Sequence, residues 1–335
     1  MKFVLVEDLK PEMVTMKNLY NNNGNLLVAK NKKLTQDMIN KIQKIGYIGL
    51  YIYDNDVDKD YKEIISDTLR IKTIQSLKTL NIDATIKFTH DIINELLNNV
   101  DSMCIDLKDL RDYDNYTYQH SINVAILSIT IGIGMGFKKK ELQQLGLSAI
   151  LHDLGKLKIP KEILNKPSKL TKEEYEEVKK HSRLGYDLIK QNYNIKAVSK
   201  VGVLSHHENE DGTGYPQGLK SAKIHKFAKI IHVADVYDAL THKRVYKDAY
   251  SALEAIEYIM ANTNIMFDEK VVEVFLKYII VYPVGSYVLL SNNEKAIVLE
   301  NNRHMPLRPI VRLNDGSVIN LMEQLNITII QQFIK

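Results

Sequence analysis

Two short stretches of this chain concentrate residues whose types and spacing could do chemistry. His152–Lys156 reads HDLGK, and His206–Pro216 reads HHENEDGTGYP. Histidine and aspartate are common ligands of first-row metal ions in catalytic sites, and a nearby lysine can neutralise charge that develops on a phosphate. Together the two stretches predict a metal-centred site for hydrolysis of a phosphate ester.

Five of the ten histidines lie between positions 120 and 207. A lone histidine on an apolar helix face is normally a core residue whose polar atoms are satisfied locally. Several together with an inward-facing aspartate, Asp235, would be costly to bury without a shared partner, and a metal site satisfies them all at once. The five histidines are His120, His152, His181, His206 and His207.

Hydrophobic periodicity places each of these residues in a predicted helix or at its end. His152 and Asp153 follow a helix expected at Leu145–Leu151, and His206 follows one at Val198–Leu204. His120 directly precedes the apolar helix expected at Ser121–Ile133. His181 lies on a helix face that is expected to be buried, together with Tyr175, Val178, Gly185 and Leu188. Asp235 lies on the buried face of a helix expected at Phe227–Leu240.

The donor set indicates which ions such a site would take. Imidazoles and carboxylates without a thiolate suit iron or manganese, with zinc or another first-row metal as alternatives. Six or seven ligands exceed the need of one ion, so two divalent metal ions bridged by a carboxylate are expected, and such a pair suits in-line displacement at phosphorus. Asp153, next to His152 at a helix end, is the best candidate for the bridge.

Lys156 and the glycines of the second stretch complete the predicted site. Lys156 lies three residues after Asp153, beyond a glycine that permits a tight turn, and can point at a bound phosphate. Asp211–Gly214 can bring the backbone close to a ligand. The alternatives are a solvated lysine and a plain surface turn.

Composition excludes several classes of partner. The 335 residues are 45% hydrophobic and 26% charged, with a net charge of +4 and one cysteine, Cys104, so no disulfide can form within the chain. We expect a cytoplasmic protein that binds neither a nucleic-acid polymer nor a membrane. The longest uncharged stretch, Ser121–Phe137, is short for a membrane span and reads as a core helix.

The order of the predicted elements indicates a mainly α protein with smaller β-containing units at its ends. Residues 1–55 read as a small α+β domain, 56–106 as connecting helices, 107–282 as a helical-bundle catalytic domain and 283–335 as a small antiparallel β module. The connecting helices could alternatively form a homodimer interface. An acidic pocket made by Val4–Asp8 and Asp54 would resemble a phosphoacceptor receiver domain, but the next fifty residues lack its alternating strands and helices.

From about Tyr113 to about Lys247 the chain resembles the HD-GYP family of HD-domain phosphohydrolases. The shared motifs occur in the family's order: YTYQHSINVA, LHDLGKLKIP, KPSKLTKEE, His181, HHENEDGTGYPQGL and IHVADVYDALTHKRVYK. The resemblance implies a helical-bundle core, a centre of two or three metals and hydrolysis of cyclic-di-GMP to pGpG or on to GMP.

The resemblance also implies roles for individual residues. Lys156 matches a lysine of the family that contacts a phosphate of the substrate. The implied metal ligands are His120, His152, Asp153, His181, His206, His207 and Asp235, and the implied substrate-binding residues are Lys156, Gly214, Tyr215, Pro216, Arg244 and Lys247.

One departure from the family's pattern bears on the number of metals. Members with three metals carry a glutamate four residues before the first histidine, where this chain has Tyr116. Tyrosine is a poor ligand here, so we expect two metals and pGpG as the main product. Val245 also replaces a proline of the family, without removing a ligand.

Two other functions stay open. A different HD-type phosphohydrolase could act on cyclic GMP-AMP or another nucleotide. A non-catalytic sensor could bind the dinucleotide and signal through its flanking domains, although degenerate members lose ligands that this chain keeps.

Overall fold

The apolar stretch predicted as a core helix forms α5 (Tyr116–Gly134), around which the other core helices pack. Residues 122–131 of this helix are buried on every side, in keeping with its nearly uniform apolar surface. α6 (Lys139–Leu151) and α11 (Lys226–Thr241) pack along it, and α13 (Glu269–Tyr278) also contacts it. α5 is therefore the central element of the core.

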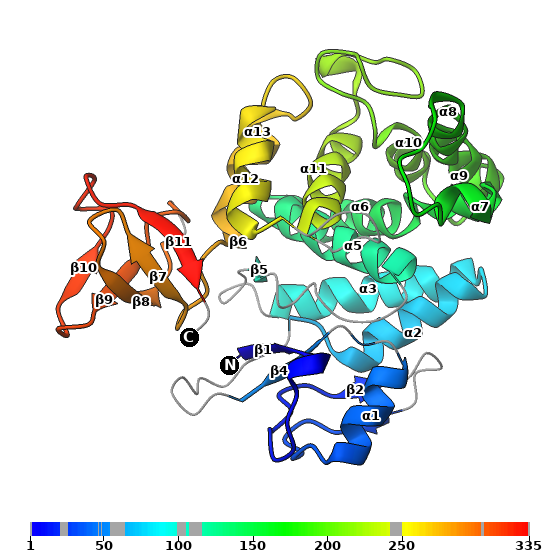
Figure 1. Ribbon diagram of the computed structural model, residues 1–335. Helices are drawn as coiled ribbons and strands as arrows, with labels where there is room; N and C mark the ends of the chain where they lie inside the picture. The colour runs from blue at the N-terminus through cyan, green and yellow to red at the C-terminus, as the bar shows by residue number, and fades with distance from the viewer. Residues whose placement is uncertain are drawn as a thin grey trace.

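The molecule is mainly helical, as predicted, with small sheets at both ends of the chain (Figure 1). The computed structural model describes residues 2–20, 26–45, 47, 49–53, 64–98, 105–106, 116–241, 250–302 and 305–333.

Several helices begin or end where the sequence predicted chemistry. α6 ends at Leu151, directly before His152, and the short 3-10 helix η3 (Leu154–Lys158) follows. α9 (His181–Ile189) begins with His181, and α10 (Ala197–Ser205) ends directly before His206. Because η3 packs on α9, and α10 packs on α6, α9 and α11, these helix ends are brought together.

One face predicted to be buried is only partly so. α7 (Lys161–Leu164) is followed by α8 (Lys172–Lys179), which begins with a capping box formed by Thr171 and Glu174. The chain then turns at Lys180 into α9, so residues before and after this point do not share one face. His181 is buried, whereas Tyr175 is 49% exposed and Leu188 is 41% exposed, which makes the prediction for those two wrong.

The helices before and after the central part pack on the same core. α2 (Asp67–Lys78) packs on α3 (Ile82–Asn98) and on α5, and α3 packs on α6. α12 (Ala252–Ala261) packs on α11 and α13. This agrees with the expectation that the connecting helices cover the chain's own core, and the homodimer stays a prediction.

The N-terminal unit has a hydrophobic cluster of its own. β1 (Lys2–Leu5) pairs with β4 (Gly49–Ile52) in antiparallel register, and β2 (Leu19–Tyr20) pairs with β3 (Leu26–Val28). α1 (Gln36–Ile45) packs against them through Ile39 and Ile42, and Thr35 accepts a hydrogen bond from the Met38 amide at its start. The antiparallel pairing is unlike the parallel sheet of a receiver domain, which that alternative requires.

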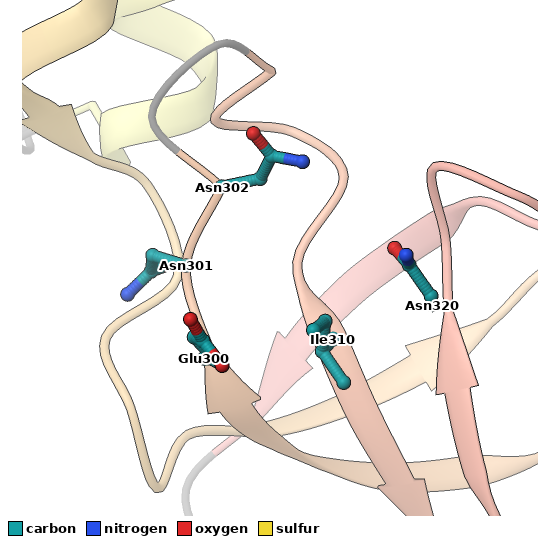
Figure 2. Close-up of a pocket in the computed structure, with 5 residues that line it drawn as sticks. All are labelled: Glu300, Asn301, Asn302, Ile310 and Asn320. Carbon is teal, nitrogen blue, oxygen red and sulfur yellow. The ribbon is translucent and has the colours of Figure 1, made fainter.

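The C-terminal sheet has five strands, four of which are predicted by apolar runs at Tyr287–Leu290, Ala296–Leu299, Ile310–Leu313 and Val318–Leu321. Its order is β10-β9-β8-β7-β11, all antiparallel. The sequence reading missed β11 (Ile329–Phe333), whose residues pair with β7. The other strands are β7 (Tyr287–Leu290), β8 (Lys295–Glu300), β9 (Ile310–Leu313) and β10 (Val318–Asn320). Figure 2 shows a pocket on this sheet, lined by Glu300, Asn301, Asn302, Ile310 and Asn320.

A short parallel pair, β5 (Ile105–Asp106) with β6 (Ile279–Ile280), joins the start of the core to its end and was not predicted. Its partners are more than 170 residues apart in the sequence, so no local pattern points to it. No helix among the described residues is long and apolar enough to cross a membrane. The domain boundaries at residues 55, 106 and 282 stay predictions.

Candidate metal centre

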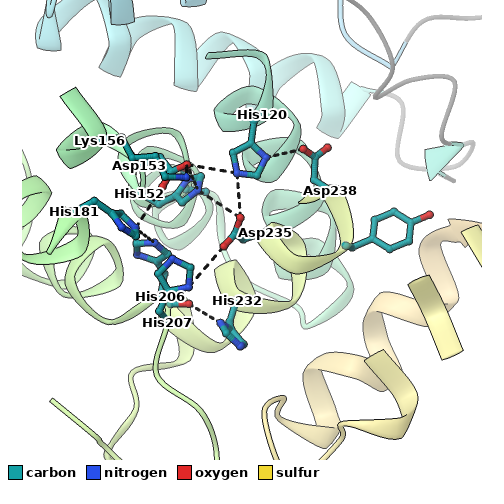
Figure 3. A network of polar contacts seen from close by, with 12 residues as sticks. His120, His152, Asp153, Lys156, His181, His206, His207, His232, Asp235 and Asp238 are labelled. Carbon is teal, nitrogen blue, oxygen red and sulfur yellow. Dashed lines mark hydrogen bonds and ion pairs between the residues drawn. The ribbon is translucent and has the colours of Figure 1, made fainter. Parts of the chain in front are cut away.

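The structure brings the seven predicted ligands into one cluster between α5, α6, α9, α10 and α11 (Figure 3). Their ligand atoms form three overlapping groups in which all atoms lie within 4.8 Å of one another. His207 is partly exposed and the others are buried. The groups are His120, His152 and Asp153; His152, His206 and Asp235; and His181, His206 and His207.

Three of the imidazoles are oriented by the ends of helices. His152, His181 and His206 each follow the last turn of a helix, where backbone carbonyls lack a partner within the helix. Each ring lies with Nδ1 at 2.7 Å from the carbonyl of the residue three positions earlier, namely Ala149, Val178 and Val203. Since a carbonyl oxygen can only accept a hydrogen bond, Nδ1 must carry the proton and donate it. Nε2 of each ring therefore keeps a lone pair.

These lone pairs converge in a way that fits a cation. Nε2 of His181 and Nε2 of His206 face each other at 3.2 Å, although neither carries a proton in the tautomer set by Nδ1. Nε2 of His152 and Oδ1 of Asp153 are buried and make no hydrogen bond. Buried acceptors that face one another are costly without a positive partner. The residues therefore fit a metal centre, and histidines whose other nitrogen is anchored in this way are typical of one.

Two carboxylates connect the two halves of the cluster. Asp153 has Oδ2 at 3.6 Å from Nε2 of His120 and 3.5 Å from Nε2 of His152, while its Oδ1 lies 3.4 Å from Nε2 of His181. Asp235 also faces both halves, because its Oδ1 lies 3.0 Å from Nε2 of His120 and its Oδ2 lies 3.9 Å from Nδ1 of His207. Each carboxylate thus offers one oxygen to each half, which is what a bridge between two ions needs.

The charges in this cluster are strongly coupled. Burial by itself would raise the pKa of Asp153, but the Lys156 ammonium and the surrounding imidazoles outweigh it and hold the pKa well below its usual range. Burial likewise opposes ionisation of Asp235, and His120 overcomes it, so this pKa is also well below its usual range. Both groups are carboxylates at neutral pH.

Burial has the opposite consequence for the imidazoles. Burial is the largest cause that lowers the pKa of His152 and His181, and it lowers the pKa of His206 and His207 well below the usual range. These four rings therefore stay neutral and keep the lone pairs that a metal ligand requires.

Lys156 lies at the edge of the cluster, where the sequence predicted it. Its Nζ lies 2.5 Å from Oδ2 of Asp153, and its side chain is 29% exposed. Gly155 is needed here for a different reason from the predicted tight turn. A Cβ at this position would lie 1.9 Å from the His181 carbonyl oxygen, so glycine allows η3 to approach the backbone of α9.

The sequence reading missed Asp238, which is fully buried beside His120. Its Oδ2 lies 2.6 Å from Nδ1 of His120, while Nε2 of the same ring lies 3.0 Å from Oδ1 of Asp235. Burial disfavours the imidazolium, but these two carboxylates outweigh it and raise the pKa of His120 to about 9. A metal ion at this Nε2 must therefore replace a proton. The sequence does contain a signal for this role, because Asp238 lies about one helical turn after Asp235 on the same buried face of α11.

The predicted glycine-rich loop lies directly over His207. The Tyr215 ring stacks on the His207 ring, with centroids 4.6 Å apart, and the Tyr215 amide donates to the His207 carbonyl at 3.0 Å. A Cβ at Gly214 would lie 2.4 Å from that same carbonyl oxygen, so the close approach requires glycine. Pro216 follows Tyr215 through a cis peptide bond. The loop is thus next to the cluster, as predicted.

Glu208 is a second residue that the sequence reading missed. Its side chain is buried, and its two carboxylate oxygens accept hydrogen bonds from the amides of Gln217 at 2.7 Å and Leu219 at 2.8 Å. Buried charge-assisted bonds of this kind are among the stronger ones in proteins. Glu208 therefore fixes the far end of the loop that carries Tyr215.

Three predictions fall outside the described residues. Arg244 and Lys247, expected to bind substrate phosphates, belong to a segment that the structure does not describe, as does Val245. Tyr116 begins α5, but its side chain is also outside the described part. The roles of Arg244 and Lys247 and the limit of two metals stay predictions.

Metal binding is expected to stabilise the protein measurably. Adding Mn²⁺ to chelator-treated protein at about a hundred times its Kd should raise the Tm by about 5–10 °C, because the ion binds only the folded cluster. Differential scanning calorimetry would measure the shift. Ca²⁺, which prefers sites made only of oxygen ligands, should give none. An unchanged Tm with Mn²⁺, Fe²⁺ and Zn²⁺ would contradict the assignment.

Comparison with known proteins agrees with this geometry. The model of a family described as an HD domain matches residues 96–271, just over half of the chain. The chain belongs to the HD-domain family. All seven predicted ligands lie within the matched HD domain.

Similar proteins include phosphodiesterases of cyclic dinucleotides. The cyclic di-GMP phosphodiesterase PA4108 of Pseudomonas aeruginosa is 37% identical over 67% of this chain and 54% of its own length. The 3′3′-cGAMP-specific phosphodiesterase 1 of Vibrio cholerae is 29% identical over 67% of this chain and 52% of its own length. The chain therefore spans about half the length of such relatives.

A solved structure shares the fold beyond the HD domain. It is Bd1817, an HDG"Y"P protein from Bdellovibrio bacteriovorus, with a TM-score of 0.52 and 17% sequence identity. The match covers 82% of this chain and 97% of Bd1817. At this identity the likeness concerns the fold alone.

Proposed function

We propose that this protein is a metal-dependent phosphodiesterase that hydrolyses cyclic-di-GMP to pGpG. The observation that carries the proposal is the pair of carboxylates, Asp153 and Asp235, that each present one oxygen to either half of the histidine cluster. Two ions held by these residues would supply Lewis-acid stabilisation of the charge that develops at phosphorus during in-line displacement. Relatives that share the HD domain are cyclic-di-GMP phosphodiesterases.

The chain's own residues would bind and orient the substrate. One ion would be held by His120, His152 and Asp153, and the other by the group around His181, with Asp153 shared. Lys156 would move its ammonium from Asp153 toward a phosphate oxygen and neutralise charge that develops in the transition state. Its partial exposure leaves it this freedom.

The loop over His207 would close one side of this site. Glu208 holds the loop through two backbone amides, and Tyr215 is stacked on a ring of the cluster. Bound substrate would lie against Gly214, Tyr215 and Pro216, next to Lys156. Pre-organised walls of this kind reduce the cost of ordering a ligand.

A second substrate, cyclic GMP-AMP, has one specific observation in its favour. The Vibrio cholerae relative specific for 3′3′-cGAMP aligns over as much of this chain as PA4108 does. The two dinucleotides share the cyclic backbone that would reach the metals and differ in one base. A sensor without catalysis is disfavoured because all seven predicted ligands are present and converge.

The test is a product analysis on protein purified without oxygen. Metal per chain is counted, the protein is incubated with cyclic-di-GMP or cyclic GMP-AMP, and the products are separated by chromatography. We expect two metals per chain and pGpG as the main product. No cleavage of either dinucleotide by metal-loaded protein would overturn the proposal, and faster cleavage of cyclic GMP-AMP would transfer it to that substrate. A count of three metals would overturn the inference from Tyr116.

Glu208 offers a prediction about the loop. Glu208→Ala should raise the KM for cyclic-di-GMP by about tenfold, because the amides of Gln217 and Leu219 lose their acceptors and the loop loses its fixed position. Steady-state kinetics would measure this. Metal content should not change, since Glu208 lies in none of the ligand groups. An unchanged KM would show that the loop needs no such anchor.

A further inference from the structure

Beside the loop, two residues of α8 extend the rim of the metal centre. Nζ of Lys179 lies 5.7 Å from the centre of the Tyr215 ring and 4.9 Å from the centre of the Tyr175 ring. The ammonium thus lies near both tyrosines, within the range of cation–π attraction. Neither Tyr175 nor Lys179 belongs to a metal group or to the glycine-rich loop.

The contacts form a continuous row from the cluster to the surface. His207, in one of the metal groups, stacks on Tyr215, and Lys179 connects Tyr215 to Tyr175. If a ligand binds with its phosphate at the metal centre, the rest of that ligand would therefore lie along this row of side chains.

Tyr175 is suited to receive a flat group. Its side chain is 49% exposed, so the ring is accessible to a ligand. The helix that carries it is held in place by the Thr171 capping box and by Lys166, whose Nζ lies 2.6 Å from Oε2 of Glu174. The exposed ring therefore projects from a fixed backbone.

Lys179 adds a cation beside the Tyr175 ring. Its Nζ lies 2.6 Å from Oε1 of Glu176, a carboxylate that is itself 65% exposed. Such an exposed pair holds weakly, so an anionic ligand can compete with Glu176 for the ammonium. An exposed ring with a cation beside it is a common way to bind a base and its phosphate.

We propose that Tyr175 and Lys179 of α8 form the outer half of the substrate site, where a purine base of the cyclic dinucleotide stacks on the Tyr175 ring. This assignment rests on the proposed function and adds to it the residue that recognises the base. Stacking acts in the ground state and the transition state alike, so it affects KM and leaves kcat unchanged.

The experiment compares Tyr175→Ala with Tyr175→Phe and with Tyr193→Ala, a matched control whose ring is 95% exposed. Kinetics with cyclic-di-GMP are measured together with binding of the same ligand by calorimetry. Base–aromatic stacking predicts that KM and Kd rise about tenfold in Tyr175→Ala, with kcat within about twofold, and that both other variants behave like the wild type. Hydrolysis of ethyl 4-nitrophenyl phosphate, which has no base to reach Tyr175, should be unchanged.

The outcomes separate this inference from the function on which it rests. Wild-type protein that cleaves cyclic-di-GMP, with Tyr175→Ala having the same KM and Kd, would overturn the role of Tyr175 alone. Equal losses on both substrates would show a structural role and would also overturn it. If the wild type binds cyclic-di-GMP without cleaving it, the proposed function fails, and the Kd of Tyr175→Ala still decides the inference. If the wild-type protein does not bind cyclic-di-GMP at all, both the proposed function and the role of Tyr175 are overturned.

Discussion

Asp153→Asn is expected to lower kcat/KM for cyclic-di-GMP by about 10³-fold and to reduce the metal content of the protein. Oδ1 of Asp153 faces His181, and Oδ2 faces His120 and His152, so this side chain connects both halves of the cluster. Asparagine keeps the shape but loses the charge and one ligand oxygen. The loss of several kcal/mol of charge stabilisation corresponds to a factor of this size.

Metal analysis and steady-state kinetics on the same preparation would measure both effects. Asp187→Asn is the matched control, because Asp187 is a partly exposed aspartate of α9 paired with Lys190. That variant should keep the metal content and activity of the wild type within about twofold, as expected for a surface ion pair. Full activity and full metal content in Asp153→Asn would remove Asp153 from the site.

Asp238→Asn is expected to weaken metal binding by about 10–100-fold without removing any predicted ligand. Its carboxylate accepts from Nδ1 of His120 and so directs Nε2 of the same ring, which lies 3.0 Å from Oδ1 of Asp235, toward the ligand cluster. An amide at this position can instead donate to Nδ1, which places the proton on Nε2 and blocks the ligand atom. Effects of this size are typical when the partner of a metal-bound histidine is removed.

Competition with a chelator of known affinity would measure the change, and activity should recover in part with excess metal. Since Asp238 is fully buried, the Tm of the chelator-treated variant separates metal binding from folding. Asp268→Asn is the control, because Asp268 also holds a partly buried cation, Lys229 at 2.8 Å, but belongs to no metal group. Equal metal affinity in Asp238→Asn and wild type would show that His120 needs no orienting carboxylate.

Much of the site could be predicted from the sequence because its ligands follow helix ends. His152 comes directly after α6, and His206 directly after α10. A histidine at the end of a helix can donate Nδ1 to an unpaired carbonyl, so its position along the chain also determines its tautomer. Local periodicity was therefore enough to find these residues and to suggest that they act together.

The roles that the sequence reading missed depend on how the chain turns and folds back on itself. Asp238 and His120 are 118 residues apart, so no local pattern joins them. The sequence reading gave Glu208 no role, because its role depends on the loop that returns to place the amides of Gln217 and Leu219 beside it. Tyr175 was assigned to a buried face, and the turn at Lys180 placed its ring at the surface instead.

The sequence by itself determined the mainly helical class, the ligand types and the metal chemistry that they favour. These follow from periodicity and from the chemistry of histidine, aspartate and lysine, which are local properties. Only the tertiary structure decided how the ligands group, which carboxylates span both halves, and that Asp238 orients His120. Such facts depend on the packing of α6, α9, α10 and α11 against one another and on α5, which brings together atoms that are far apart along the chain.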